Sequence, residues 1–314
     1  MVTYRDCLKE QSTEKCNKMC AEQTLENYET CALGEIFLPN IKSDDEFKDV
    51  LTLNYRLIKH SLMLPSHHPE TQEAVHRNMR MGLGLTGLAQ STKEQLSWLP
   101  DAYEFLREYD EKYSDVYGMP TSIKLTTTKP SGTLSLLPGV TPGIHPAFAK
   151  YMIRRITIAT EHPLVEICRK AGYLMEYKRN FDGSLDRGSL IISFPYSYSD
   201  GTILAESMSA IDQLEFIRLI QTIWSDNSVS CTVYYEASEV SNIRKYLEEN
   251  YLRSFKSLSF LLRQENGFDQ QPYEAISKEE FDALVASTTP IHEITTEVQF
   301  EGGEECEAGH CPIR

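Results

Sequence analysis

The sequence contains no apolar run that approaches the roughly 20 residues of a membrane-spanning helix. Its first ten residues also lack the apolar core of a secretory signal. Positive charge is not in excess, because 46 acidic and 31 basic side chains give a net charge of −15. A nucleic-acid polymer needs a basic surface, so that class of partner is excluded. We therefore expect a cytosolic protein that binds neither a membrane nor a nucleic-acid polymer.

The composition is that of a soluble globular protein, with 41% hydrophobic and 25% charged residues among 314. A single nucleotide is compatible with the negative charge, because a helix N-terminus can bind phosphate locally. The eight cysteines of such a chain are not expected to form a structural disulfide framework. They are candidates for buried filler, metal ligands or redox chemistry. Cys168 and Cys231 fall in apolar segments and are expected to be buried filler.

Hydrophobic periodicity predicts strands that alternate with helices, and there is no internal repeat or low-complexity tract. Strands are expected at residues 31–39, 122–128, 190–194, 229–235 and 257–262. Helices are expected at residues 43–61, 91–117 with a break near Pro100, 163–171, 210–224, 238–251 and 277–286. Residues 1–30 show little periodicity and indicate a loop. This alternation favours an α/β fold with parallel strands.

Gly82, Gly84 and Gly87 match the dinucleotide-binding fingerprint as a string of letters. That fingerprint requires a strand before it and a helix after it. The preceding residues, 71–80, have a helical and polar pattern instead. The glycines therefore predict a glycine-rich turn rather than a dinucleotide site.

Cys306 and Cys311 lie five residues apart at the end of the sequence. The segment before them is acidic and contains Gly302 and Gly303, which predicts a mobile tail. A dithiol on a mobile tail is poorly placed to build a core. It is well placed to exchange with a disulfide elsewhere in the protein.

A second group of thiols lies near the start of the sequence, where Cys20 is followed by Glu22 and then by Cys31. A thiol beside a carboxylate can take part in hydrogen-atom or proton transfer, and two nearby cysteines can form a reversible disulfide. Most pairs of cysteines at such a spacing never meet in the fold. Cys16 and Cys20 have the spacing of a metal half-site, but the second pair of ligands that zinc needs is missing, so no metal is expected.

A candidate phosphate site is formed by the segment Lys129-Pro130-Ser131-Gly132-Thr133-Leu134, which follows a predicted strand and precedes a predicted short helix. The glycine allows backbone N–H groups to approach an anion, and the two hydroxyls and the lysine add donors. An ordinary helix start at Pro-Ser explains the pattern equally well.

Together these segments resemble the adenosylcobalamin-dependent (class II) ribonucleoside-triphosphate reductases of the monomeric type. The resemblance runs from about Met19 to Arg314. Its most specific stretches are residues 129–145, 151–155, 226–235 and 306–314.

The resemblance implies an α/β fold, the second half of a ten-stranded α/β barrel. Residues 1–294 would belong to the catalytic barrel, with a finger loop at about residues 14–30. Residues 295–314 would form the flexible redox tail.

It also implies roles for individual residues. Cys20 would carry the thiyl radical that removes the substrate 3′-hydrogen, Glu22 would be the adjacent base, and Cys31 would be half of the dithiol that reduces the 2′-carbon. Residues 130–134, from Pro130 to Leu134, would hold the phosphates. Cys306 and Cys311 would re-reduce the active-site disulfide and be reduced by thioredoxin or a similar protein. Adenosylcobalamin would be the cofactor and ribonucleoside triphosphates the substrates.

Two features depart from the family pattern. Its finger loop contains Asn-x-Cys-x-Glu, and here Lys18 occupies the Asn position, with Asn17 one residue earlier. Family members are also about twice as long, and their N-terminal half carries the partner of the thiol at Cys31. The chain is thus expected to work with a separately encoded N-terminal half. The alternatives are an inactive truncated copy and a thiol-relay or nucleotide-binding module without radical chemistry.

Overall fold

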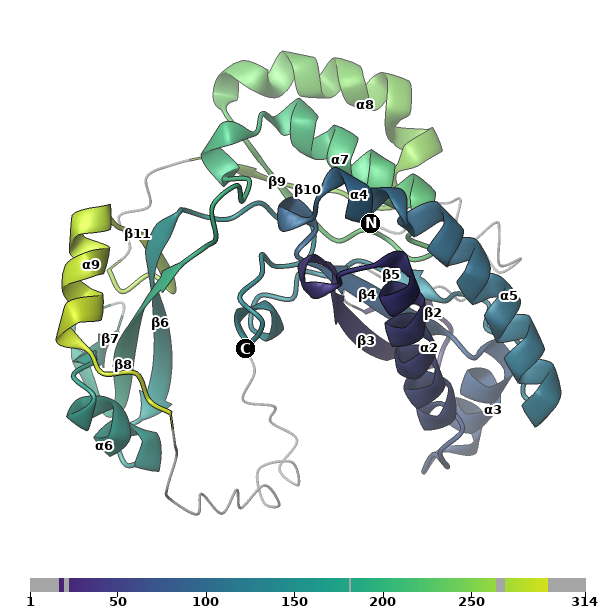
Figure 1. Ribbon diagram of the computed structural model, residues 1–314, viewed down its shortest axis with the longest axis horizontal. Coiled ribbons are helices and arrows are strands. Elements are labelled where there is room, and N and C mark those ends of the chain that lie inside the picture. Colours follow the sequence, from purple (N-terminus) through teal and green to yellow (C-terminus); the bar gives the residue numbers. More distant parts are fainter. Residues whose placement is uncertain (1–16, 20–22, 181, 264–268, 293–314) are drawn as a thin grey trace. The chain divides into compact units, whose positions relative to one another are not determined.

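The computed structural model describes residues 17–19, 23–180, 182–263 and 269–292 (Figure 1). The chain divides into two compact units. The first comprises residues 1–150 and 198–265, and the second comprises residues 151–197 and 266–314. Each unit has its own sheet, and the two sheets are of different types.

The first unit is built on parallel strands. Strands β3 (Ala32–Phe37), β4 (Met81–Thr86) and β5 (Thr126–Thr127) form one parallel sheet in that order. Strand β9 (Thr232–Tyr235) pairs in parallel with β10 (Ser259–Leu262).

A parallel bridge joins these two groups of strands, between Thr128 and Val229. Backbone bonds on either side extend it, from Asn227 N to Thr126 O at 3.1 Å and from Ser230 N to Thr128 O at 2.9 Å. The parallel ladder therefore runs β3-β4-β5-β9-β10, in the order of the sequence. The predicted α/β class is confirmed, whereas closure into a barrel remains a prediction.

Helices connect successive strands of this ladder, as parallel pairing requires. They are α2 (Asp44–Ser61), α3 (Pro69–Asn78), α4 (Lys93–Ser97), α5 (Leu99–Tyr117), α7 (Ala210–Ile223) and α8 (Val240–Ser254). Single 3₁₀ turns are η1 (Leu38–Asn40), η2 (Leu88–Gln90), η3 (Leu134–Leu136), η4 (Ala205–Ser207) and η5 (Ala237–Glu239). In Figure 1, α2 and α5 lie along β3–β5, and α7 and α8 lie along β9 and β10.

One hydrophobic core joins these helices to one face of the ladder. It takes Ile36 from β3, Leu83 from β4 and Val233 from β9, together with buried side chains of α2, α5, α7 and α8. The core lies on the face of the ladder to which Gly34 belongs, because a Cβ added at Gly34 would lie 2.6 Å from the Ile58 side chain of α2. Side chains alternate along a strand, so the residues between the core positions lie on the opposite face.

Local signals fixed the helix starts. Ser43 caps α2 by accepting a hydrogen bond from Glu46 N at 3.2 Å. The capping box of α4 joins Thr92 to Gln95, one residue later than the Ser91–Glu94 pattern predicts. Helix α4 ends at Ser97 and α5 begins at Leu99, one residue before Pro100, so the predicted break is confirmed.

Three local predictions are wrong in this unit. The glycines at 82 and 84 lie in the fully buried strand β4, not in a turn. Residues 17–19 and 23–25 form the short antiparallel strands β1 (Asn17–Met19) and β2 (Gln23–Leu25), where a loop was expected. The short helix predicted after residues 129–134 is only the 3₁₀ turn η3.

The second unit is an antiparallel sheet in the order β11-β6-β8-β7. Its strands are β6 (Tyr151–Ala159), β7 (Leu174–Arg179), β8 (Leu185–Ser197) and β11 (Tyr273–Ala275). Helices α6 (Pro163–Lys170) and α9 (Lys278–Ser287) belong to the same unit. The expectation of parallel strands throughout the chain is therefore wrong for these residues.

Cys168 and Cys231 are both buried, as predicted for apolar filler. Within the described ranges, no helix is both long enough and apolar enough to span a membrane.

Candidate functional site

The face of the parallel ladder that lies away from the helices carries small and polar residues. On β3 it presents Leu33 and Glu35, which pair in register with Gly82 and Gly84 of β4. A Cβ at Gly82 would lie 2.8 Å from Thr127 Cγ2, so Thr127 of β5 belongs to this face as well. We call this surface, defined by Leu33, Glu35, Gly82, Gly84 and Thr127, the open face.

Glu35 is a buried carboxylate on the open face, with a side chain that is 3% exposed. Its Oε1 accepts a hydrogen bond from the Thr86 hydroxyl. Its Oε2 lies 3.1 Å from Lys129 Nζ. A Cβ at Gly84 would lie 3.1 Å from the same Oε2, so glycine there leaves room for the carboxylate.

This ion pair ties β3 to the start of the predicted phosphate segment. A buried carboxylate is costly unless it is paired, and Lys129 supplies the pairing charge. Lys129 is thereby held at the open face, at the carboxyl end of β5. In open α/β sheets, ligands bind beyond the carboxyl ends of parallel strands.

The phosphate segment itself is a tight turn that leads into η3. Ser131 N donates to Lys129 O at 3.0 Å and Gly132 N donates to Pro130 O at 2.9 Å. Gly143 is essential to this packing, because it has φ +57° and a Cβ there would lie 2.2 Å from Lys129 O. The predicted helix is only a 3₁₀ turn, so a phosphate would rely on side-chain hydroxyls and on Lys129 more than on a helix N-terminus.

Buried hydroxyls surround this turn. The side-chain oxygens of Thr128, Ser131, Ser135 and Thr141 are buried and have no hydrogen-bond partner among the described residues. Buried polar groups are normally paired, so such a group calls for a ligand, an ordered water or an ion. Thr133 and Leu134, at the end of the segment, are exposed. The arrangement suits an anion that would be bound by hydroxyl donors.

His145 links the residues after this turn to β9. Its Nε2 accepts a hydrogen bond from Thr232 N at 3.1 Å, so Nδ1 carries the proton and donates to Pro142 O at 3.1 Å. Burial lowers the pKa of His145 below its ordinary value of 6.5. The neutral ring is therefore the form that fits the fold.

The thermal stability of the chain is expected to fall as the pH drops below about 6.5, in part because of His145. The unfolded chain takes up a proton at its ordinary pKa of 6.5, whereas the folded ring takes it up only at lower pH. Stability is thus present above pH 6.5 and is lost as the pH falls towards the pKa of the folded state. The melting temperature between pH 5 and 8, measured for the chain and for His145→Gln, should depend less on pH in the variant. Identical pH profiles would contradict this role.

The structure places two of the predicted site segments on the same ladder, with Cys31 at the amino end of β3 and residues 130–134 beyond the carboxyl end of β5. Cys31 is half-buried and directly precedes β3, the strand that carries Glu35. Lys18 lies in β1. Cys20, Glu22, Cys306 and Cys311 lie outside the described residues, so their predicted roles stay predictions.

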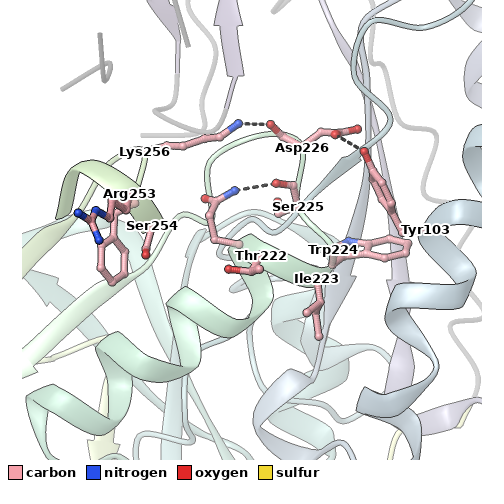
Figure 2. A pocket seen from close by; sticks show the side chains of 11 residues that line it. Tyr103, Thr222, Ile223, Trp224, Ser225, Asp226, Arg253, Ser254 and Lys256 are labelled. Atoms are coloured by element: carbon pink, nitrogen blue, oxygen red, sulfur yellow. Dashed lines mark hydrogen bonds between the residues drawn. The ribbon is translucent and has the colours of Figure 1, made fainter. Parts of the chain in front are cut away.

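A polar cavity of about 310 Å³ lies near the start of β9 and β10, at the other end of the ladder (Figure 2). Asp226 is its central carboxylate. Its carboxylate accepts hydrogen bonds from the Tyr103 hydroxyl at 2.7 Å, from Arg107 at 2.8 Å and from Leu125 N at 2.8 Å. Its backbone carbonyl accepts a hydrogen bond from Lys256. These hydrogen bonds connect the segment before β9 with α5 and with the residue before β5. Because both carboxylate oxygens already accept hydrogen bonds, Asp226 is not available as a catalytic acid.

Three residues of the first unit were missed by reasoning from sequence alone. Glu35 lay within a strand that was predicted to be buried, and a buried glutamate in such a strand is the signal that could have identified it. Gln23 lay in a segment that was predicted to be a loop. His145 lay in a family-like stretch, but its contact with Thr232 depends on a residue that is 87 positions away in the sequence.

Solved structures identify the fold. A crystal structure of B-12 dependent (class II) ribonucleotide reductase matches 90% of this chain and 43% of its own, with a TM-score of 0.78 and 26% identity. The class Id ribonucleotide reductase alpha subunit of Actinobacillus ureae matches 83% of this chain and 55% of its own, with a TM-score of 0.52 and 14% identity, which supports the fold alone. The chain therefore has the fold of part of a ribonucleotide reductase chain.

Curated relatives identify the family. "Probable adenosylcobalamin-dependent ribonucleoside-triphosphate reductase" of Dictyostelium discoideum is 33% identical over 280 residues, which is 87% of this chain and 36% of the relative. The reductases of Euglena gracilis and Levilactobacillus brevis are 33% and 28% identical over 85% and 94% of this chain, and over 37% and 45% of their own lengths. No protein-family model matches the chain. The chain is a homologue of the adenosylcobalamin-dependent ribonucleoside-triphosphate reductases, and it spans between about a third and a half of the length of these relatives.

Proposed function

We propose that this chain supplies the phosphate-binding loop and the active-site thiols of a ribonucleoside-triphosphate reductase. The reaction would convert ribonucleoside triphosphates to 2′-deoxyribonucleoside triphosphates. The observation that carries the proposal is the ion pair between Glu35 and Lys129 at 3.1 Å. It fixes the strand that follows Cys31 against the turn that begins the predicted phosphate segment, in a chain homologous to such reductases over 87% of its length.

The proposed chemistry divides into thiol and phosphate functions. Cys20, as a thiyl radical, would take the 3′-hydrogen of the substrate, with Glu22 as the adjacent base. Cys31 and a second thiol would give two electrons to the 2′-carbon, which loses its hydroxyl as water, and the two thiols would leave as a disulfide. Ser131 and Thr133, with Lys129 beside them, would bind the triphosphate.

Adenosylcobalamin is the cofactor named for the relatives, and when bound it would supply the initiating radical. Three of the cavities that the described residues line hold about 310, 500 and 580 Å³, and each suits a ligand much smaller than a corrin with its nucleotide loop. The cofactor is therefore assigned to the complete enzyme.

A separately encoded N-terminal half is the partner that the chain would need. The edge strand β10 is exposed, with Leu261 at 50% and Phe260 at 37%. An exposed apolar strand edge invites pairing with another chain. The N-terminal half would supply the second thiol of the dithiol, and thioredoxin or a similar protein would reduce the tail. A cytosolic location would accompany this role.

The tail gives the experiment that tests the proposal. Cys306→Ser or Cys311→Ser, in the chain reconstituted with the N-terminal half, should allow one turnover and then stop when thioredoxin is the only reductant. The reason is that the first turnover uses the pre-reduced active-site dithiol, and only later ones need the tail. Deoxynucleotide formed per enzyme should be measured in single-turnover and multiple-turnover assays. An equal loss in both assays would show that the tail has another role.

A further inference from the structure

Gln23 is a buried amide without a hydrogen bond. It begins β2, its residue is 3% exposed, and both its Nε2 and its Oε1 are buried with no partner among the described residues. A buried polar atom left unpaired destabilises a fold by roughly 1–3 kcal/mol. Native proteins keep such groups rarely, and mainly where they serve a function.

The amide of Gln23 lies over the open face. A Cβ added to Gly82 would lie 2.7 Å from Gln23 Nε2 and 2.8 Å from Thr127 Cγ2. Thr127 is itself fully buried, and its Oγ1 also has no partner among the described residues. The Gln23 amide and the Thr127 side chain, of which the methyl carbon is the nearer atom, thus meet above one glycine.

Gln23 and Thr127 lie near enough to the phosphate segment to contact a ligand that this segment would hold. Thr127 ends β5 and Lys129 follows it by two residues, which is at most about 7 Å along the chain. Leu33 lies beside the buried pair, 2.6 Å from the same Gly82 Cβ position, and is itself 40% exposed. A nucleotide with its phosphates at residues 130–134 would place its sugar within reach of Gln23.

We propose that Gln23 and Thr127 form a subsite for the sugar hydroxyls of the bound nucleotide. The chemistry is complementary, because an amide and a hydroxyl each offer both a donor and an acceptor, as two neighbouring sugar hydroxyls do. Gly82 keeps the space between them open. The inference rests on the proposed function, since it takes the phosphates to be bound at residues 130–134.

The test exploits opposite effects on stability and binding. Gln23→Leu and Thr127→Val keep the shape of each side chain and remove its unpaired polar atoms. Each variant should melt a few degrees higher than the unsubstituted chain, about 2–4 °C. Each should also bind ATP about tenfold more weakly by calorimetry, as expected for the loss of a hydrogen bond to the ligand. Binding of inorganic tripolyphosphate should be unchanged, because that probe has no sugar.

Two matched controls come from the same unit. Gln95 donates to Leu38 O at 3.0 Å and to Ile41 O at 2.9 Å, and Thr126 Oγ1 accepts from Asp226 N at 2.9 Å. Their polar atoms are already paired within the protein. Gln95→Leu and Thr126→Val should therefore lower the melting temperature and leave the ratio of ATP to tripolyphosphate affinity unchanged.

The outcomes separate this inference from the proposed function. Unchanged ATP affinity in Gln23→Leu, or an equal loss of ATP and tripolyphosphate affinity, overturns the sugar subsite and leaves the phosphate site standing. A lower melting temperature in both site variants also overturns it, because it would show that these atoms are paired in the folded chain. Failure of the unsubstituted chain to bind either probe overturns the proposed function and, with it, the subsite.

Discussion

The Asp110→Ala variant is expected to lose about 3–5 kcal/mol of folding stability, the typical effect of breaking a buried ion pair. Asp110 of α5 accepts hydrogen bonds from Tyr55 at 2.6 Å, from Lys59 at 2.8 Å and from Ser122 N at 2.7 Å. The side chains of Lys59 and Asp110 are 0% and 2% exposed. Removing the carboxylate would leave the Lys59 ammonium buried without its counter-charge.

Lys59 explains why the loss should be large. Burial lowers the pKa of Lys59 below its ordinary value of 10.5, even with Asp110 beside it. Without Asp110 the folded chain would have to release this proton near neutral pH or hold an uncompensated charge. Urea unfolding at pH 7 measures the effect, and the double variant Lys59→Met/Asp110→Ala should recover much of the stability.

Glu108, on the same helix, is the matched control. Its carboxylate pairs with Lys112 at 3.2 Å, but the two side chains are 69% and 76% exposed. Glu108→Ala should change stability by less than about 1 kcal/mol, as exposed pairs do. A similar small loss in Asp110→Ala would contradict the role of the buried network.

Much of the first unit could be predicted because its signals are local. Helix α2 begins after Ser43, which caps it, and α7 begins after Ser209, whose side chain accepts from Asp212 N at 3.1 Å. Such caps depend on residues within one turn, so the sequence displays them directly. The parallel order of the strands followed from the same alternation of helices and strands.

The second unit could be predicted only in part, because α6, α9 and the strand at residues 190–194 were expected, whereas β6, β7 and β11 were not. Strand β6 contains Arg154 and Arg155 in the middle of its apolar residues, which breaks a simple alternation. The arginines are accommodated by β11, since Arg154 stacks over the Tyr273 ring at 4.3 Å and Arg155 pairs with Glu274. Strand β11 lies more than 110 residues away in sequence, and only the tertiary structure brings it to β6.

The glycines of β4 could not be interpreted from sequence for a similar reason. Glycine inside a strand often marks a close approach of another group. Here the group at Gly84 is the Glu35 carboxylate, and at Gly82 it is the Gln23 amide. Neither partner is visible in the string Gly-x-Gly, so the sequence favours a turn there. Residues 129–134 could be singled out as a candidate because their pattern is continuous in sequence, and their phosphate role stays a prediction.

The Cys20→Ala variant is expected to abolish formation of deoxyribonucleotides by the chain reconstituted with its N-terminal half. Alanine has no sulfur that could carry the radical, and the 3′-hydrogen would then have no acceptor. The assay should be run at single turnover with a pre-reduced dithiol, so that the tail and thioredoxin play no part. Product at the rate of the unsubstituted chain would disprove the assignment of Cys20.

Cys168→Ala is the control for the loss of a thiol as such. Cys168 lies in α6, is buried, and has a pKa that burial raises, so its thiolate is scarce at neutral pH. This variant should keep its turnover and lose only packing stability. ATP and tripolyphosphate binding should be intact in both variants, because neither cysteine belongs to residues 130–134. Loss of activity with retained binding in Cys20→Ala alone would therefore locate the defect in the radical step, whereas loss in both variants would indicate damage to the fold.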